Sequence, residues 1–139
     1  MQAQFKEALG VDVELANVEG SVFASEQKEL KYQLSRSSFL HDYADPVNAI
    51  ESFITGSSMN RTGWSNAEFD KLIADAKAET DAAARWQLLM DAEKVLMDEM
   101  PIFPIHFYNQ VALQKPNVSG IVRHPVGYLD LKWVDKTNE

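Results

Sequence analysis

Helical periodicity dominates the middle of the chain. A first predicted helix spans residues 45–56, and a second follows Ser65 and Glu68, which have the spacing of a capping box. A third runs from about residue 80 to residue 100, where Pro101 stops it. Their apolar stripes contain Val47, Ile50, Phe53, Ile54, Phe69, Leu72, Ile73, Ala76, Trp86, Leu89, Ala92, Val95 and Leu96.

Alternation of apolar and polar residues predicts strands elsewhere. By this criterion, strands are predicted at residues 11–16, 32–35 and 129–134. A further strand is predicted at residues 102–113, which are apolar and rich in aromatic and branched residues, with Pro104 indicating an edge or a bend at its start. Short helices are predicted at residues 1–9 and from Ser21 to about Leu30. The resulting order, α, β, α, β, α, α, α, β, β, indicates an α/β protein with a mixed sheet flanked by helices.

Composition narrows the class of protein. The 139 residues carry a formal charge of -8, which argues against nucleic acid as a partner. Cysteine is absent, and the three histidines, His41, His106 and His124, are dispersed, so we expect no metal site. No apolar run approaches the roughly 20 residues of a membrane span. No nucleophile or phosphate-binding motif is present.

The first predicted helix has no polar lead-in before it. Residues 1–9 carry a helical pattern that ends at Gly10, yet no N-cap precedes them. We therefore expect the chain to be a fragment of a longer protein.

The candidate site is the stretch from Tyr32 to Pro46. It joins a predicted strand to a predicted helix, and such junctions lie at the rim of a sheet, where open α/β sheets bind ligands. This stretch gathers one cation, aromatic rings, a histidine and an acid, namely Arg36, Phe39, His41, Asp42 and Tyr43. Asp42 is suited to receive an ammonium group, and Arg36 to bind a carboxylate.

Each of these residues also has a structural interpretation. Asp42 fits a turn or capping acid, and Arg36 fits an ion pair with Asp42 or a solvated side chain. The aromatic rings of Phe39 and Tyr43 fit a core as well as ligand walls. His41 and Asp42 are adjacent in an extended segment, so their side chains should point to opposite faces rather than form a catalytic dyad.

Several segments resemble one known family. The chain is similar to the C-terminal lobe of the oligopeptide- and dipeptide-binding proteins of bacterial ABC importers, whose two lobes form a periplasmic-binding-protein-like fold of class II. The resemblance covers nearly the whole chain, in matching order and spacing. It rests on Leu9-Gly10-Val11-Asp12-Val13, Asp42-Tyr43-Ala44-Asp45-Pro46, Asn60 to Ile73, Ala92-Glu93-Lys94-Val95-Leu96-Met97, Met100-Pro101-Ile102, Pro104-Ile105 and Lys115-Pro116.

The resemblance implies a solute-binding protein that captures peptides and delivers them to the transmembrane subunits of a permease. It implies that Asp42 holds the α-ammonium group of the peptide, that Phe39 lines the pocket and that Arg36 lies near the carboxyl end. Gly20 and Gln27 depart from the family pattern, where tryptophan and arginine occur, which puts the carboxyl-end contacts in doubt. Related members carry nickel, haem or sugars, so a non-peptide ligand is the alternative.

The resemblance also implies a domain division and a location. Residues 1–110 would form the second-lobe domain, and residues 111–139 would return to a first lobe that this chain lacks. Leu129, Leu131 and Trp133 would then be without their usual partners. The location would be extracytoplasmic, either periplasmic or anchored to the outer face of the membrane as a lipoprotein.

Two rival interpretations belong to other classes of protein. One is a small hydrolase that uses His41 with Asp45 or Asp70, although the sequence offers it no nucleophile motif. The other is a structural interaction domain without a ligand.

Overall fold

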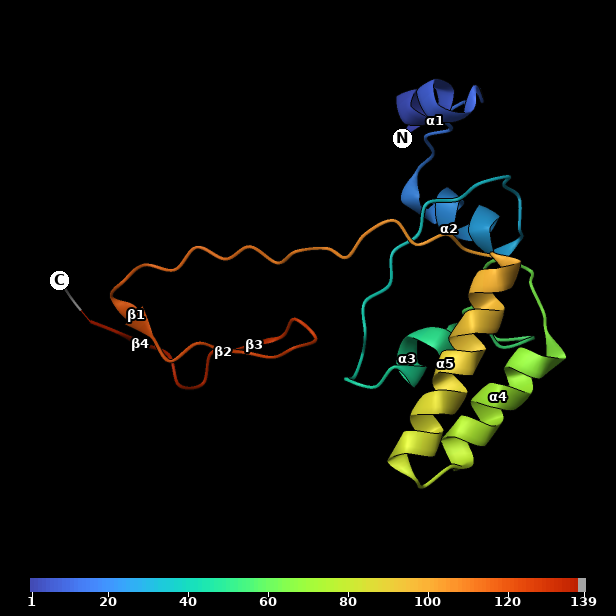
Figure 1. Cartoon of the computed structure of the whole chain (residues 1–139). Coiled ribbons are helices and arrows are strands. Elements are labelled where there is room, and N and C mark those ends of the chain that lie inside the picture. Colours follow the sequence, from blue (N-terminus) through green and yellow to red (C-terminus); the bar gives the residue numbers. More distant parts are fainter. Residues whose placement is uncertain (138–139) are drawn as a thin grey trace. The chain divides into compact units, whose positions relative to one another are not determined.

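The structure, a computed structural model, describes residues 1–137. Its contacts divide the chain into two compact units, of which the first is Met1–Arg36. This first unit contains α1 (Gln2–Leu9) and α2 (Gly20–Lys28) (Figure 1). Gly10 ends α1 in the left-handed conformation, with φ of 69°, as expected for a glycine at that position.

The strands predicted at residues 11–16 and 32–35 are wrong, because neither segment belongs to a ladder within residues 1–137. Side-chain bonds hold the end of the first unit instead. The Gln27 amide Nε2 donates to Ser35 Oγ at 2.7 Å and to the carbonyl of Arg36 at 3.2 Å. A strand needs a partner, and the described residues supply none for these two segments.

The second unit begins at Ser37 and carries helices in the predicted central region, although the single helix predicted at residues 45–56 is reduced to two short ones. Its helices are α3 (Val47–Ile50), the 3-10 helix η1 (Glu51–Phe53), α4 (Ala67–Ala78) and α5 (Ala82–Glu99). The predicted cap of α4 is one residue early. Asn66, not Ser65, is the N-cap, and its Oδ1 accepts hydrogen bonds from the N–H groups of Glu68 and Phe69 at 2.9 and 3.0 Å.

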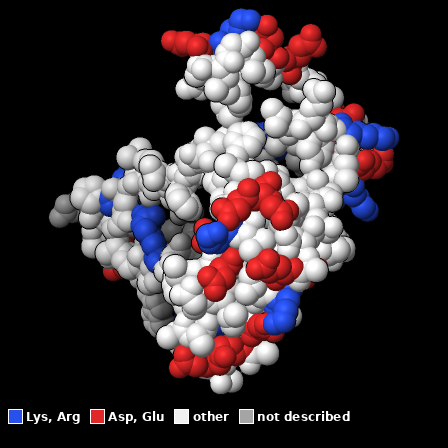
Figure 2. All heavy atoms as spheres, turned by 45° about the vertical axis from the view of Figure 1, so that its right-hand side comes forward, with Lys and Arg blue, Asp and Glu red and all other residues white. Residues whose placement is uncertain are grey.

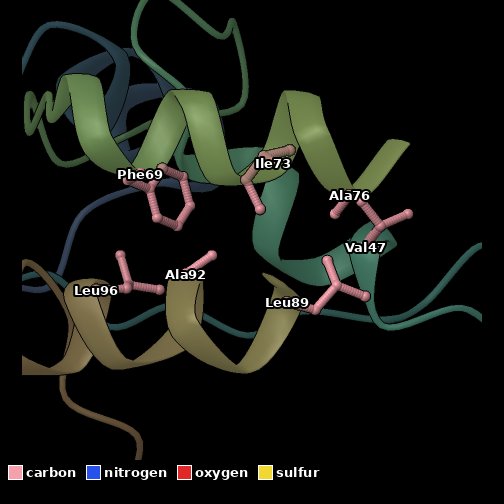
Figure 3. Close-up of a cluster of buried hydrophobic side chains, with 7 residues drawn as sticks. All are labelled: Val47, Phe69, Ile73, Ala76, Leu89, Ala92 and Leu96. Atoms are coloured by element: carbon pink, nitrogen blue, oxygen red, sulfur yellow. The ribbon is translucent and has the colours of Figure 1, made fainter. Parts of the chain in front are cut away.

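The core of the second unit lies between α4 and α5 (Figure 3). Phe69, Ile73 and Ala76 of α4 point toward Leu89, Ala92 and Leu96 of α5, and Val47 of α3 joins them. Phe69, Ile73, Ala76 and Ala92 have no exposed surface. Burial of this apolar surface therefore anchors the segment that begins at Val47 to the helix pair.

Residues 101–117, which follow α5, form neither a helix nor a ladder (Figure 1). Met100 closes the helix with φ of 51°, and Pro101 follows. The strand predicted at residues 102–113 is therefore wrong as an assignment within residues 1–137. Its large apolar side chains are exposed: Phe103 47%, Ile105 61%, Phe107 98%, Val111 87% and Leu113 100%.

Two small antiparallel ladders complete the described chain. β1 (Val118–Ser119) pairs with β4 (Asp135–Lys136), and β2 (Val122–Arg123) pairs with β3 (Leu129–Asp130). The strand predicted at residues 129–134 is thus reduced to two residues. Leu129, Leu131 and Trp133 are 54%, 59% and 65% exposed, so none of them is buried in a sheet.

The surface reflects the acidic composition. On the face shown in Figure 2, Asp and Glu side chains form several groups among fewer Lys and Arg side chains. Among residues 1–137, no helix combines the length and the apolar character needed to cross a lipid bilayer.

Candidate functional site

The loop that carries most of the predicted site residues is fastened at Asp45. The carboxylate oxygen Oδ1 accepts a hydrogen bond from the N–H of Val47 at 2.9 Å, which caps the start of α3. Arg85 Nη2 on α5 lies 2.9 Å from each carboxylate oxygen of Asp45. The Arg85 guanidinium, followed by the Val47 N–H, lowers the pKa of Asp45 below its ordinary value.

Asp42 and Phe39 line an open hollow of about 520 Å³. This volume lies within the range of small-ligand pockets. The two carboxylates in its wall are Asp42 and Glu51, and its lining contains no Lys, Arg or His. The other lining residues are Asn48, Ser52, Ile54, Thr55, Gly56, Ser57 and Met59.

Glu51 is already compensated by its neighbours. Lys77 Nζ on α4 forms an ion pair with Glu51 Oε2, and the Tyr43 hydroxyl donates to Oε1 at 3.0 Å. The Lys77 ammonium is the main cause that lowers the pKa of Glu51, and the Tyr43 hydroxyl adds to it. Tyr43 thus acts on the wall of the hollow through Glu51, although it is not itself a lining residue.

In the wall of this hollow, Asp42 is fixed by a hydrogen bond of its backbone and not by a bond of its carboxylate. Its N–H donates to the side-chain Oδ1 of Asn48 at 2.8 Å. The side chain of Asp42 is exposed, and it lines the hollow. An exposed carboxylate in a wall without cations is suited to a cationic ligand group.

His41 faces a different hollow from Asp42. This second hollow, of about 290 Å³, is mainly apolar and is lined by His41 with Ile50, Phe53, Trp86 and Met90 among others. The His41 ring also meets the Phe39 ring edge-on, with centroids 5.5 Å apart. The side chains of His41 and Asp42 therefore line different hollows, in agreement with the prediction for adjacent residues of an extended segment.

The acids considered for a hydrolase are engaged elsewhere. Asp45 binds Arg85, and Asp70 Oδ1 accepts a hydrogen bond from the N–H of Thr55 at 2.9 Å. Within residues 1–137 no group of three potential ligands is placed to hold a metal ion.

Arg36 belongs to the first unit, whereas Phe39, His41, Asp42 and Tyr43 belong to the second. The structure thus brings four of the five predicted residues onto one short loop. Of these, Phe39 and Asp42 share a hollow.

Sequence reasoning missed Asn48, Glu51 and Ser52. A signal for two of them exists, because Asn48 and Ser52 are polar residues four positions apart inside an apolar helical pattern. Both are buried, with 7% and 9% of their surface exposed. Polar residues at buried positions mark places where the backbone or a ligand needs a partner.

No family model matches the chain. Individual proteins do. The dipeptide-binding protein DppE of Bacillus subtilis is 59% identical over 98% of this chain and 25% of its own length. The oligopeptide-binding protein OppA of Bacillus subtilis is 40% identical over 91% of this chain and 24% of its own.

Solved structures agree with the sequence relatives. The substrate-binding domain of an oligopeptide ABC transporter from Bacillus anthracis matches with a TM-score of 0.79 and 28% identity, over 99% of this chain and 27% of that one. The periplasmic murein tripeptide-binding protein MppA, in its unliganded open form, matches with a TM-score of 0.79 and 32% identity, over 86% of this chain and 23% of that one.

The predicted fold class is confirmed by these likenesses, because the matched structures are peptide-binding proteins of this fold. The relatives are solute-binding proteins rather than enzymes. This chain spans about a quarter of their length. By sequence and by fold, the chain is similar over nearly its whole length to one part of dipeptide- and oligopeptide-binding proteins, among them the substrate-binding domain of an ABC transporter.

Proposed function

We propose that this chain is part of the solute-binding component of an ABC importer, and that Asp42 receives the α-ammonium group of a captured peptide. The observation that carries the proposal is the wall around Asp42. It holds two carboxylates and no cation, and one of the two, Glu51, is compensated by Lys77. Asp42 therefore supplies the charge that a cationic ligand group would meet.

The other predicted residues have supporting roles in this proposal. Phe39 offers an apolar wall beside Asp42, and Tyr43 braces Glu51. Arg36 would meet the carboxyl end of the peptide. His41 would contribute its ring to the packing around Phe39 rather than a proton to a reaction.

A complete site needs more chain than these residues provide. The hollow is open, and peptide capture relies on surrounding a ligand so that its charged ends are paired on all sides. We propose that residues 1–110 belong to the second lobe and that residues 111–139 reach the first lobe. The first lobe would close over Asp42 in the full-length protein.

The location and the partners follow from the same proposal. The name of the relative MppA includes the word periplasmic, which supports an extracytoplasmic location for this protein. The protein would be periplasmic or anchored as a lipoprotein, and it would deliver its peptide to the transmembrane subunits of the permease.

The test is made on full-length protein. A mixture of short peptides is passed over it, and bound material is identified by mass spectrometry. We expect peptides with free amino termini to be retained. Asp42→Asn should then weaken binding of a retained peptide by about a hundredfold in calorimetry, since an ammonium group loses its charged partner.

The matched control is Asp98→Asn, which removes an exposed carboxylate that pairs with Lys94 on α5. It should leave the dissociation constant unchanged. An unchanged dissociation constant in Asp42→Asn would remove Asp42 from the site. Retention of a metal, a haem or a sugar in place of peptides would replace the peptide by another ligand class.

A further inference from the structure

We propose that Asn48 is the positioning residue that aims the Asp42 carboxylate at the ligand ammonium group. This inference rests on the proposed function of Asp42. Asn48 lies on α3, six positions after Asp42, and its Oδ1 accepts the hydrogen bond from the N–H of Asp42 at 2.8 Å.

One end of this bond is shielded from water, whereas Asp42 at the other end is exposed. Asn48 is 7% exposed, so its side chain is a nearly buried polar group. Loss of this bond would leave the buried oxygen of Asn48 without its partner, which is the costly half of a broken hydrogen bond. The oxygen of Asn48 is therefore a fixed point on α3, at the edge of the apolar core that holds Val47.

The loop needs such a fixed point. Residues 37–46 contain no helix or strand, and their backbone geometry depends on bonds to the structure that follows. Asp45 is fixed by Arg85 and by the N–H groups of Val47 and Asn48. The hydrogen bond to Asn48 fixes the same loop at Asp42, the residue whose carboxylate would bind the ligand.

The geometry indicates that Asn48 positions Asp42 rather than contacting the ligand itself. A hydrogen bond to the N–H of Asp42 fixes the backbone of that residue, so only rotation about its short side chain remains free to move the carboxylate. Asn48 also lines the hollow, but with 7% of its surface exposed it offers a ligand little area. Its contribution to binding would therefore pass through Asp42, as preorganisation of a charged group.

The test compares two peptides in the full-length protein, tri-alanine and its N-acetylated form. Acetylation removes the ammonium charge. The dissociation constant of the acetylated peptide divided by that of the free peptide therefore measures what Asp42 contributes to binding. Asn48→Leu keeps the approximate size of the side chain and removes the acceptor. We expect it to lower this ratio by about tenfold, the effect of losing one hydrogen bond whose acceptor side chain is buried.

Asn48→Asp is the rescue variant, because it retains an oxygen acceptor at the same position. It should keep the wild-type ratio or raise it. If Asn48→Leu fails to fold, Asn48→Ala, which adds no bulk, is measured in the same way. The matched control is Asn66→Leu, which removes another side-chain acceptor of backbone N–H groups, at the cap of α4. It should lower the unfolding midpoint and leave the ratio unchanged.

The outcomes distinguish the two proposals. A ratio that stays at the wild-type value in Asn48→Leu, with both peptides weakened equally, would make Asn48 a structural residue and overturn this inference alone. A ratio near one in the wild type would mean that acetylation has no effect, which would overturn the role of Asp42 and this inference together.

Discussion

The contact between Asp45 and Arg85 ties the site loop to α5, and its strength can be measured separately from the cap on α3. Arg85 Nη2 lies 2.9 Å from both oxygens of Asp45, and the two side chains are 28% and 32% exposed. The same carboxylate accepts from the N–H of Val47 at 2.9 Å. Asp45 therefore makes one charged contact and one capping contact.

The two contacts have similar expected magnitudes, but different variants remove them. Loss of a cap costs about 1 kcal/mol. A partly shielded ion pair is worth about 1 kcal/mol, at the upper end for exposed pairs. Asp45→Ala should thus lower the free energy of unfolding by about 2 kcal/mol, whereas Asp45→Asn, which keeps an oxygen for Val47, should lower it by about 1 kcal/mol. Arg85→Gln should lower the free energy of unfolding by about as much as Asp45→Asn, because each variant removes the ion pair and keeps the cap.

Acid should abolish the difference between wild type and Asp45→Asn. The folded-state pKa of Asp45 is lowered by the Arg85 guanidinium, then by the Val47 N–H, from an ordinary 3.8. A lowered pKa in the folded state contributes stability that is present above the unfolded-state pKa and is lost as the pH falls through the folded value. The difference should be constant near neutral pH and should shrink below about pH 4.

The assay is urea unfolding of the wild type, Asp45→Asn, Arg85→Gln and the double variant, followed by tryptophan fluorescence. The coupling energy of this cycle should be about 1 kcal/mol near neutral pH. Asp98→Asn, which removes an exposed partner of Lys94, is the control and should change stability little. A coupling energy below about 0.3 kcal/mol, or a difference that grows on acidification, would refute the reasoning.

Three further predictions concern the core, a helix cap and the dependence of peptide binding on the proposed first lobe. Phe69→Ala should lower the free energy of unfolding by about 3 to 5 kcal/mol in urea titrations, because Phe69 is fully buried and packs against Trp64; a loss below about 1 kcal/mol would contradict this packing. Asn66→Ala should cost about 1 kcal/mol in thermal melts through the α4 cap, while Ser65→Ala, one residue earlier, should cost little; equal losses would contradict the assignment of the cap. The isolated chain should give no calorimetric signal with peptides at micromolar concentration, whereas full-length protein should bind them, and binding by the isolated chain would show that the hollow suffices.

Helices were predictable because their signals are local. Asp81 caps α5 through the N–H of Ala84, next to the predicted start at about residue 80, and Pro101 lies just beyond its end, as predicted. The cap of α4 was misplaced by one residue because Ser65 and Asn66 are both good capping residues, and only the backbone decides between them.

Strands were less predictable because a strand depends on a partner that its own sequence does not contain. Residues 102–113 have the aromatic and branched composition of a strand, yet no ladder forms on them within residues 1–137. The site likewise contains one residue with a local sequence signal and one whose role depends on a partner elsewhere in the chain. Asp42 stands out in the sequence, whereas Asn48 becomes informative only once its oxygen is seen beside the N–H of Asp42.

The exposed apolar row at residues 103–113 has a consequence for anyone who produces this chain alone. Phe107 and Leu113 are 98% and 100% exposed, on a segment whose backbone groups are not paired in a ladder. We expect such an exposed apolar segment to favour association with other copies of the chain. Aggregation at this row, rather than unfolding of the α4–α5 pair, will limit the concentration at which the isolated chain can be handled.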